Sequence, residues 1–289
     1  MSDLMQKIKD LRELTGAGFL DCKKALEENN NDIDDSIDYL RKKGLSKASK
    51  KSSREAKEGA IGIYMNEKYA VMLEIKSETD FAAKNDVFLD FLDFIGKIAL
   101  QFDDIQEISV NDFLNKNFEQ KKISDYFTDI IAKIGENIVL SRISFLKKDS
   151  NSEFYTYTHN PYRSNIGKIC VLLKAEVKDI NEDSKIFGKN ICMQIAASKP
   201  VSIDIDDLDK EIIKREEEVQ FATIKSSGKP ENIIEKILKG KMQKFYTETT
   251  LLNQIYILDN DKIVNEVISD FSKTNFFKVL QFELFVLGS

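Results

Sequence analysis

Residues 59–84 read GAIGIYMNEKYAVMLEIKSETDFAAK and contain the patterns that decide the fold class. Residues 61–65 and 69–75 are rich in β-branched and apolar residues, which predicts two strands. The polar residues 66–68 between them are typical of a turn, so the strands should form a hairpin. A helix should follow and pack a broad aromatic face on a sheet, because apolar residues recur at helical spacing: Phe88, Phe91, Leu92, Ile95 and Ile98.

Thr79-Asp80-Phe81 lies at the corner between the second strand and this helix. A corner of this kind presents side chains to the surface, so Phe81 could protrude and contact another molecule. The residues also allow a second interpretation. In that one Phe81 tucks under its own helix as part of the core, and Asp80 serves as a helix N-cap.

The first 44 residues predict a compact unit of three helices. The first helix ends at Gly16-Ala17-Gly18, a second short helix follows, and Asp32 is a suitable N-cap for the third, which Gly44 should close. One face of the first helix is apolar at three- and four-residue steps, through Leu4, Ile8, Leu11 and Leu14.

Residues 45–57 (LSKASKKSSREAK) have the small, polar and basic composition of a linker. From Arg41 to Lys57 the chain carries eight basic residues and one acidic residue. A nucleic-acid-binding patch is one interpretation, but interleaved aromatic residues are absent from this run. A solvated connector between domains is the other.

The succession of strands and helix recurs later in the chain. Strands are predicted at 138–145, 153–159 and 169–177, a helix near 185–197, and a final strand at 276–287. Residues 207–246 instead carry apolar stripes of helical period on either side of a turn at Gly228-Lys229-Pro230, which predicts a helical hairpin.

The predicted fold class is α+β with antiparallel sheets. A three-helix domain, a two-part α+β core and a projecting antiparallel helical hairpin make up the chain. The predicted boundaries are a helical domain at 1–44, a basic linker at 45–57, core subdomains at 58–145 and at 146–206 with 247–289, and the hairpin at 207–246.

The composition narrows the classes of function. The 289 residues are 42% apolar, 32% charged and carry a net charge of -6, which favours a folded protein with a well-solvated surface over a membrane or nucleic-acid binder. Three scattered cysteines, a start without a targeting signal and short apolar runs favour the cytoplasm. With a single histidine and no hydrolase, zinc-site or phosphate-loop motif, we expect no enzyme activity, cofactor or metal.

Five separated blocks resemble the elongation factor Ts family in the same order along the chain. The first two are Arg12 to Gly18 with Asp21 to Leu26, similar to the family's ubiquitin-associated-like (UBA-like) domain, and Thr79-Asp80-Phe81-Ala82-Ala83-Lys84. The others are Lys133-Ile134-Gly135-Glu136-Asn137, Ala196-Ala197-Ser198-Lys199-Pro200, and Ser227 to Phe245 followed by Leu251-Leu252-Asn253-Gln254.

This resemblance implies a guanine nucleotide exchange factor that binds elongation factor Tu with GDP, displaces Mg2+ and promotes GDP release. It also implies a homodimer formed through the 207–246 hairpin, with no membrane or direct nucleic-acid partner. The residues that it assigns to contact with elongation factor Tu lie in four places, namely Phe19, Leu20 and Lys23; Thr79, Asp80, Phe81 and Ala82; Ile134 and Gly135; and His159.

The chain departs from the family's pattern in three places. Residues 160–165 lengthen the loop after His159, and Gln194 stands where the family usually has a histidine. The chain ends at Ser289, so we expect it to lack the contact made by the carboxy-terminal helical module of some members.

Two other functions would fit parts of the sequence. An RNA-binding protein would use the basic run at 41–57 and would bind RNA with a steep dependence on salt. A hydrolase with an unrecognised site would need convergent polar residues in a pocket.

Overall fold

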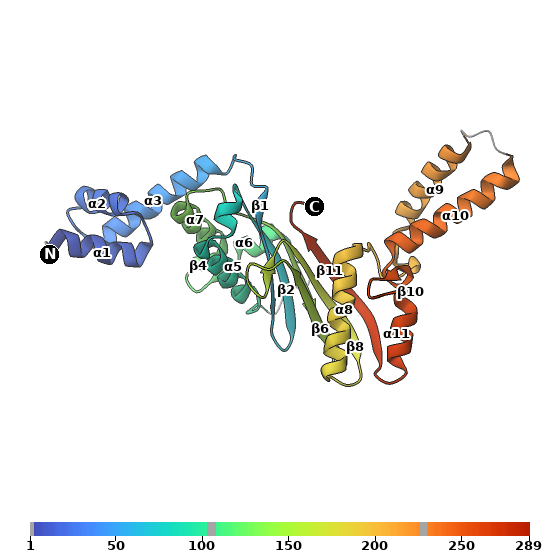
Figure 1. Cartoon of the computed structure of the whole chain (residues 1–289). Helices are drawn as coiled ribbons and strands as arrows, with labels where there is room; N and C mark the ends of the chain where they lie inside the picture. The colour runs from blue at the N-terminus through green and yellow to red at the C-terminus, as the bar shows by residue number, and fades with distance from the viewer. Residues whose placement is uncertain (1–2, 103–107, 226–229) are drawn as a thin grey trace. The chain divides into compact units, whose positions relative to one another are not determined.

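The computed structural model describes residues 3–102, 108–225 and 230–289, which form two units (Figure 1). Unit 1 consists of Met1–Lys147, Asn160–Lys168 and Phe285–Ser289, and unit 2 of Lys148–His159 and Ile169–Leu284. Within the described ranges, every helix is too short or too polar to span a bilayer.

Three helices open unit 1, as the sequence predicts: α1 (Asp3–Thr15), α2 (Phe19–Glu28) and α3 (Ile33–Lys51). Gly16 has a φ of 65°, which lets the chain turn sharply between α1 and α2. Asp32 precedes α3 and caps its start as predicted, because its Oδ1 accepts the N–H of Asp35 at 2.8 Å. The small core of this part comprises Ile8, Leu11, Cys22, Ala25 and Leu26.

The third helix is longer than predicted. Gly44 does not end it; α3 continues to Lys51 through the first half of the predicted linker. The reason is tertiary packing: Gly44 is buried, and a Cβ on it would lie 3.4 Å from the methyl group of Ala132. A glycine inside a helix costs roughly 1 kcal/mol, which close packing of this kind can offset.

A four-stranded antiparallel sheet forms the core of unit 1, in the order β5-β2-β1-β7. The predicted hairpin is confirmed as its centre. The strands are β1 (Glu58–Met65), β2 (Tyr69–Ser77), β5 (Val139–Lys147) and β7 (Ile166–Gly167).

Helices follow β2 and pack apolar faces on this sheet (Figure 1). They are α4 (Asp80–Ala83), α5 (Asp86–Ala99), α6 (Val110–Asn115) and α7 (Ile123–Ile134), with the short strands β3 (Asn117–Phe118) and β4 (Lys121–Lys122) before α7. α5 therefore lies where the sequence predicts a helix, and α6, β3, β4 and α7 add to it.

Unit 2 is built on a three-stranded sheet in the order β11-β8-β6. Its strands confirm the predicted ones, and α8 lies where a helix was expected. The elements are β6 (Ser152–His159), β8 (Ile169–Val177), α8 (Glu182–Ser198), η1 (Ile205–Asp207), η2 (Leu251–Asn253), β9 (Ile255–Tyr256), β10 (Asp259–Ile263), α11 (Val264–Ser272) and β11 (Phe277–Val286). The rings of Phe187 and Phe271 stack at 4.0 Å inside its core.

The predicted helical hairpin is present as α9 (Lys210–Lys225) and α10 (Glu231–Thr249). Ile224, Ile234 and Met242 are buried in it. Two residues of its predicted turn, Gly228 and Lys229, lie outside the described residues. These elements confirm the α+β class with antiparallel sheets, while the five domain boundaries stay predictions.

The fit between β1 and α5 generates a test of the packing in unit 1. Gly96 faces the ring of Tyr64 so closely that a Cβ would lie 2.1 Å from the ring's Cδ2. Gly96→Ala should therefore lower the free energy of unfolding by about 1–3 kcal/mol, although alanine is the better helix former. Gly240→Ala is the matched control in α10, because nothing lies within 4 Å of the added Cβ.

The control should be neutral or more stable by up to about 1 kcal/mol. Urea unfolding followed by circular dichroism measures both variants. Equal stability of Gly96→Ala and the unchanged protein would contradict the packing described for Tyr64.

Candidate partner-binding site

The corner between β2 and α4 carries a phenyl ring that stands in solvent. Phe81 is 84% exposed, more than any other large apolar side chain among the described residues. The interpretation that it protrudes is confirmed, and the alternative that it packs in its own core is wrong. Asp80 is not the N-cap either; Thr79 is, because its Oγ1 accepts the N–H of Ala82 at 3.2 Å.

Glu136 holds this corner from another part of the chain. Its Oε2 accepts the N–H of Thr79 at 3.0 Å, and its Oε1 accepts the Thr79 hydroxyl at 2.7 Å. The two residues are 57 positions apart in sequence. The second and third sequence blocks are thus joined by hydrogen bonds within unit 1.

Residues next to Thr79 and Glu136 form further hydrogen bonds between the same parts of the chain. Glu78 accepts the N–H of Asn137 at 2.7 Å, and the Asn137 side chain donates to the carbonyl of Arg54 at 2.7 Å. Lys51, the last residue of α3, donates to the carbonyl of Gly135. Gly135 ends α7 with a φ of 87°, a conformation that favours glycine. We call Lys51, Arg54, Glu78, Thr79 and residues 135–137 the junction.

Asp80 forms an ion pair on the surface beside Phe81. Its carboxylate accepts the ammonium group of Lys84 at 2.9 Å, one turn further on. This hydrogen bond lowers the pKa of Asp80 and raises that of Lys84, so both groups are charged at neutral pH. Ala82, in contrast to Phe81, is buried, and so is Ala83 after it.

The predicted contact residues of the amino-terminal helices lie together on α2. Leu20 is 77% exposed and Phe19 is 39% exposed, so both offer apolar surface. Lys23 lies on the same helix and pairs with Glu27 at 3.6 Å. Ile134, at the end of α7, is half-buried against the core of unit 1.

His159 belongs to unit 2, where it ends β6 and is exposed. Its Nδ1 lies 3.0 Å from the hydroxyl of Tyr157. The residues after it, Asn160–Lys168, belong to unit 1. Gln194, the other departure from the family's pattern, is a buried amide that donates to Gln254 and accepts the N–H of Ile257.

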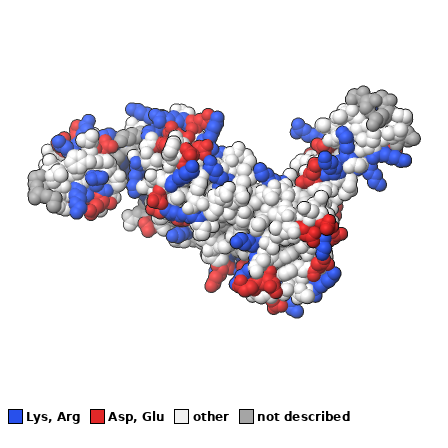
Figure 2. Space-filling view, viewed as in Figure 1, with Lys and Arg blue, Asp and Glu red and all other residues white. Residues whose placement is uncertain are grey.

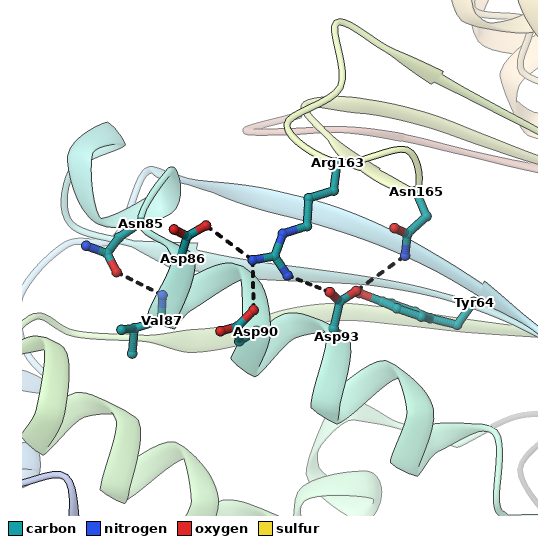
Figure 3. A network of polar contacts seen from close by, with 8 residues as sticks. All are labelled: Tyr64, Asn85, Asp86, Val87, Asp90, Asp93, Arg163 and Asn165. Carbon is teal, nitrogen blue, oxygen red and sulfur yellow. Dashed lines mark hydrogen bonds and ion pairs between the residues drawn. The ribbon is translucent and has the colours of Figure 1, made fainter.

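The lengthened loop is held by a network that the sequence analysis missed (Figure 3). Arg163 reaches three carboxylates on one face of α5, with distances of 3.3 Å to Asp86, 2.7 Å to Asp90 and 2.7 Å to Asp93. Asp93 also accepts the hydroxyl of Tyr64 at 3.0 Å. Burial, followed by the charge of Asp93, raises the pKa of Tyr64, which keeps this hydroxyl protonated. The spacing of Asp86, Asp90 and Asp93 by four and three residues, which places them on one helix face, was the feature of the sequence that could have indicated this network.

The possible metal ligands and the thiols can be located among the described residues. Among them no group of three or more His, Cys, Asp and Glu side chains could bind a metal ion. Cys22, Cys170 and Cys192 are buried, and burial raises the pKa of the Cys22 and Cys192 thiols, which disfavours the reactive thiolate. The arrangement offers apolar and charged contacts to another macromolecule.

Comparisons with known proteins show which family the chain resembles. A family model described as Elongation factor TS matches residues 78–289, which include both Thr79 and Glu136. The chain belongs to the elongation factor Ts family. Proteins named elongation factor Ts are similar to it along most of their length: that of Bartonella tribocorum is 39% identical over 95% of this chain and 88% of that protein.

Two more relatives support the assignment. The elongation factor Ts of Sinorhizobium fredii is 41% identical over 92% of this chain and 86% of that protein. The one from Halothermothrix orenii is 41% identical over 98% of this chain and 92% of that protein. The resemblance read from the five blocks is confirmed, and membership of the elongation factor Ts family makes the chain a factor of translation elongation.

The network at Arg163 predicts unequal roles for its carboxylates. Asp93→Ala leaves the buried hydroxyl of Tyr64 without this acceptor, which should lower the free energy of unfolding by about 1–3 kcal/mol. Asp86→Ala is the matched control, because its side chain is 91% exposed and exposed pairs contribute little. It should change stability by less than about 0.5 kcal/mol.

Urea unfolding of both variants measures the difference. If Asp86→Ala is as damaging as Asp93→Ala, the ion pairs rather than the buried hydroxyl determine the stability of this network.

Proposed function

We propose that this protein binds elongation factor Tu carrying GDP, displaces its Mg2+ and promotes release of the nucleotide during translation elongation in the cytoplasm. Membership of the elongation factor Ts family supports the choice of partner. The observation that carries the mechanism is the exposed ring of Phe81 on a corner that hydrogen bonds hold in place.

Exchange of this kind is a change in binding equilibria and needs no covalent step. A factor that weakens the binding of nucleotide to a GTPase is itself bound more weakly when nucleotide is present, by the same factor. The protein therefore acts as a binding partner and not as an enzyme in the covalent sense. It needs surfaces that fit the nucleotide-weakened form of the GTPase better than the GDP-bound form.

We assign a separate contact with the GTPase to each of the described surfaces. Phe19, Leu20 and Lys23 on α2 bind the GTPase, and Ile134 with Gly135 forms a second contact. Phe81 enters between helices of the GTPase and shifts the elements that hold Mg2+ and the β-phosphate. Asp80, paired with Lys84, keeps the short helix α4 formed beside the ring, and His159 adds a contact from unit 2.

The size of the effect shows why several contacts are needed. Burying one phenyl ring contributes on the order of 2 kcal/mol, which corresponds to about thirtyfold in an equilibrium constant. Phe81 can therefore supply part of the weakening of GDP binding. The contacts on α2 and at the end of α7 must supply the remaining affinity for the partner.

The basic run at 41–57 does not favour RNA binding as the function. Arg41 pairs with Asp125 at 3.5 Å, Lys43 with Asp21 at 2.7 Å and Arg54 with Glu78 at 3.5 Å. Pairing of this kind reduces the positive potential that nucleic-acid binding needs. On the face seen in Figure 2, blue and red side chains also lie interspersed over the amino-terminal helices.

Removal of the ring tests the proposed function. Phe81→Ala should slow the release of fluorescently labelled GDP from elongation factor Tu by about ten- to thirtyfold at saturating exchange factor, with folding intact. Phe276→Ala is the matched control, because it removes another exposed phenyl ring, outside the proposed contact residues. Its release rate should equal that of the unchanged protein.

The same assay addresses Mg2+. With a chelator in excess, GDP is held without the metal, so the acceleration caused by the unchanged protein should become smaller. An unaltered release rate for Phe81→Ala would refute the role of the ring, and an acceleration that does not depend on Mg2+ would refute displacement of the metal.

We also propose that α9 and α10 bind a second copy of this chain. Exposed apolar side chains on the two helices support this, and a homodimer would cover them: Ile212, Val219, Phe221 and Ile233. The base of the hairpin is suited to a deletion, because the N–H of Val201 donates to Thr249 and that of Leu251 to Ser202.

A variant in which a short linker replaces residues 207–246 should have the mass of one chain in light scattering, while the intact protein has the mass of two. Val219→Asp in the intact chain keeps the hairpin but places a charge on its exposed face, and it should also shift the mass toward one chain. If both variants have the mass of the intact protein, the hairpin is not the dimer contact.

A further inference from the structure

The short helix that carries Phe81 cannot hold its own position. α4 has four residues, which is little more than one turn, and helices of this length are unstable without tertiary contacts. Thr79 begins the helix, and its backbone and side chain both bond to Glu136. Among the hydrogen bonds of Thr79 to described residues, the other partners all lie within residues 77–83.

We propose that Glu136 is a positioning residue for nucleotide exchange, which holds Thr79 and thereby fixes where the ring of Phe81 points. This inference rests on the proposed function of Phe81. Glu136 need not contact elongation factor Tu, because its carboxylate is directed at the chain's own corner.

The hydrogen-bond geometry explains how the carboxylate acts. A hydroxyl group has one proton to donate and lone pairs with which to accept. The proton of Thr79 is directed to Glu136 at 2.7 Å, so the lone pairs of the same oxygen remain available for the N–H of Ala82 at 3.2 Å. Glu136 therefore sets the orientation in which Thr79 caps α4, and Phe81 lies in the first turn of that helix.

The charge of Glu136 strengthens both bonds. Hydrogen bonds to a carboxylate are shorter and stronger than those to a neutral acceptor. A glutamine in its place would keep one acceptor oxygen and would turn a donor group toward the Thr79 hydroxyl or N–H. Glu136→Gln should thus hold the corner less well than glutamate, and Glu136→Ala should hold it least.

The experiment measures labelled-GDP release from elongation factor Tu against the concentration of the exchange factor. Glu136→Ala should lower the maximal rate about tenfold, the value expected for loss of a charge-assisted contact, and Glu136→Gln by less. The half-saturating concentration should change by less than about threefold, because the grip on α2 is intact. Glu67→Ala removes a glutamate from the exposed β1–β2 turn and should behave as the unchanged protein.

A double-mutant comparison separates positioning from a general structural role. If Glu136 acts through the ring, Phe81→Ala with Glu136→Ala should release GDP at the rate of Phe81→Ala alone. Multiplication of the two effects would mean that Glu136 acts independently, and this would overturn the proposal. So would a loss of affinity at an unchanged maximal rate.

A second measurement is independent of elongation factor Tu. Hydrogen exchange at the amide of Ala82 should be faster in Glu136→Ala than in Glu67→Ala, at equal melting temperature. Unchanged protection of this amide would overturn the proposed link to the Thr79 cap. A normal release rate for Phe81→Ala would instead remove the proposed function, whereas a slow Phe81→Ala beside a normal Glu136→Ala would remove the positioning role alone.

Discussion

The pair of hydrogen bonds between Thr79 and Glu136 is the constraint on which the candidate site depends. The free energy of a phenyl ring in water falls when the ring folds back onto nearby apolar surface. The ring of Phe81 stays outside because the backbone beneath it is held at Thr79 and, on the other side, by the buried methyl groups of Ala82 and Ala83. On a flexible loop, an exposed ring would bury itself against neighbouring residues. Binding to a partner would then cost the free energy needed to expose the ring again.

The register between β2 and β5 places Thr79 next to Glu136. Ile75 pairs with Leu140 and Lys76 with Val139, and continuation of this register beyond the strands places Thr79 opposite Glu136. The register shifts by one residue between Glu74 and Ile75. Without this bulge the same continuation would place Thr79 opposite Asn137, whose side chain is an amide. Ser141 lies at the bulge, and its hydroxyl donates to the buried Glu74 at 2.6 Å. An irregularity inside the sheet therefore selects the carboxylate that holds the corner.

These features also show what could be predicted from the sequence. The hairpin of β1 and β2 followed from two short, almost continuous apolar runs, and the helix α5 followed from apolar residues at a period of 3.6. Burial in the core imposes both patterns directly on the sequence. The length of α3 did not, since the packing of Gly44 against Ala132 is a contact between distant residues. For the same reason the spacing around Phe81 left its exposure open. The hydrogen bonds that keep the ring outward come from Glu136, and local sequence contains no information about a partner 57 residues away.

In the proposed function, a separate contact through α2 lets the small exposed surface of Phe81 have a large effect on nucleotide binding. One ring supplies on the order of 2 kcal/mol, too little to bind a protein partner alone. The apolar surface on α2 and the ring on α4 are joined through α3, whose last residue donates to Gly135 within the junction. If α2 provides affinity for both forms of the GTPase, the contact energy of Phe81 is free to favour one form over the other. A ligand shifts an equilibrium only by the difference between its affinities for the two states. The rigidity of the corner therefore determines how much of the contact energy of Phe81 weakens the binding of nucleotide.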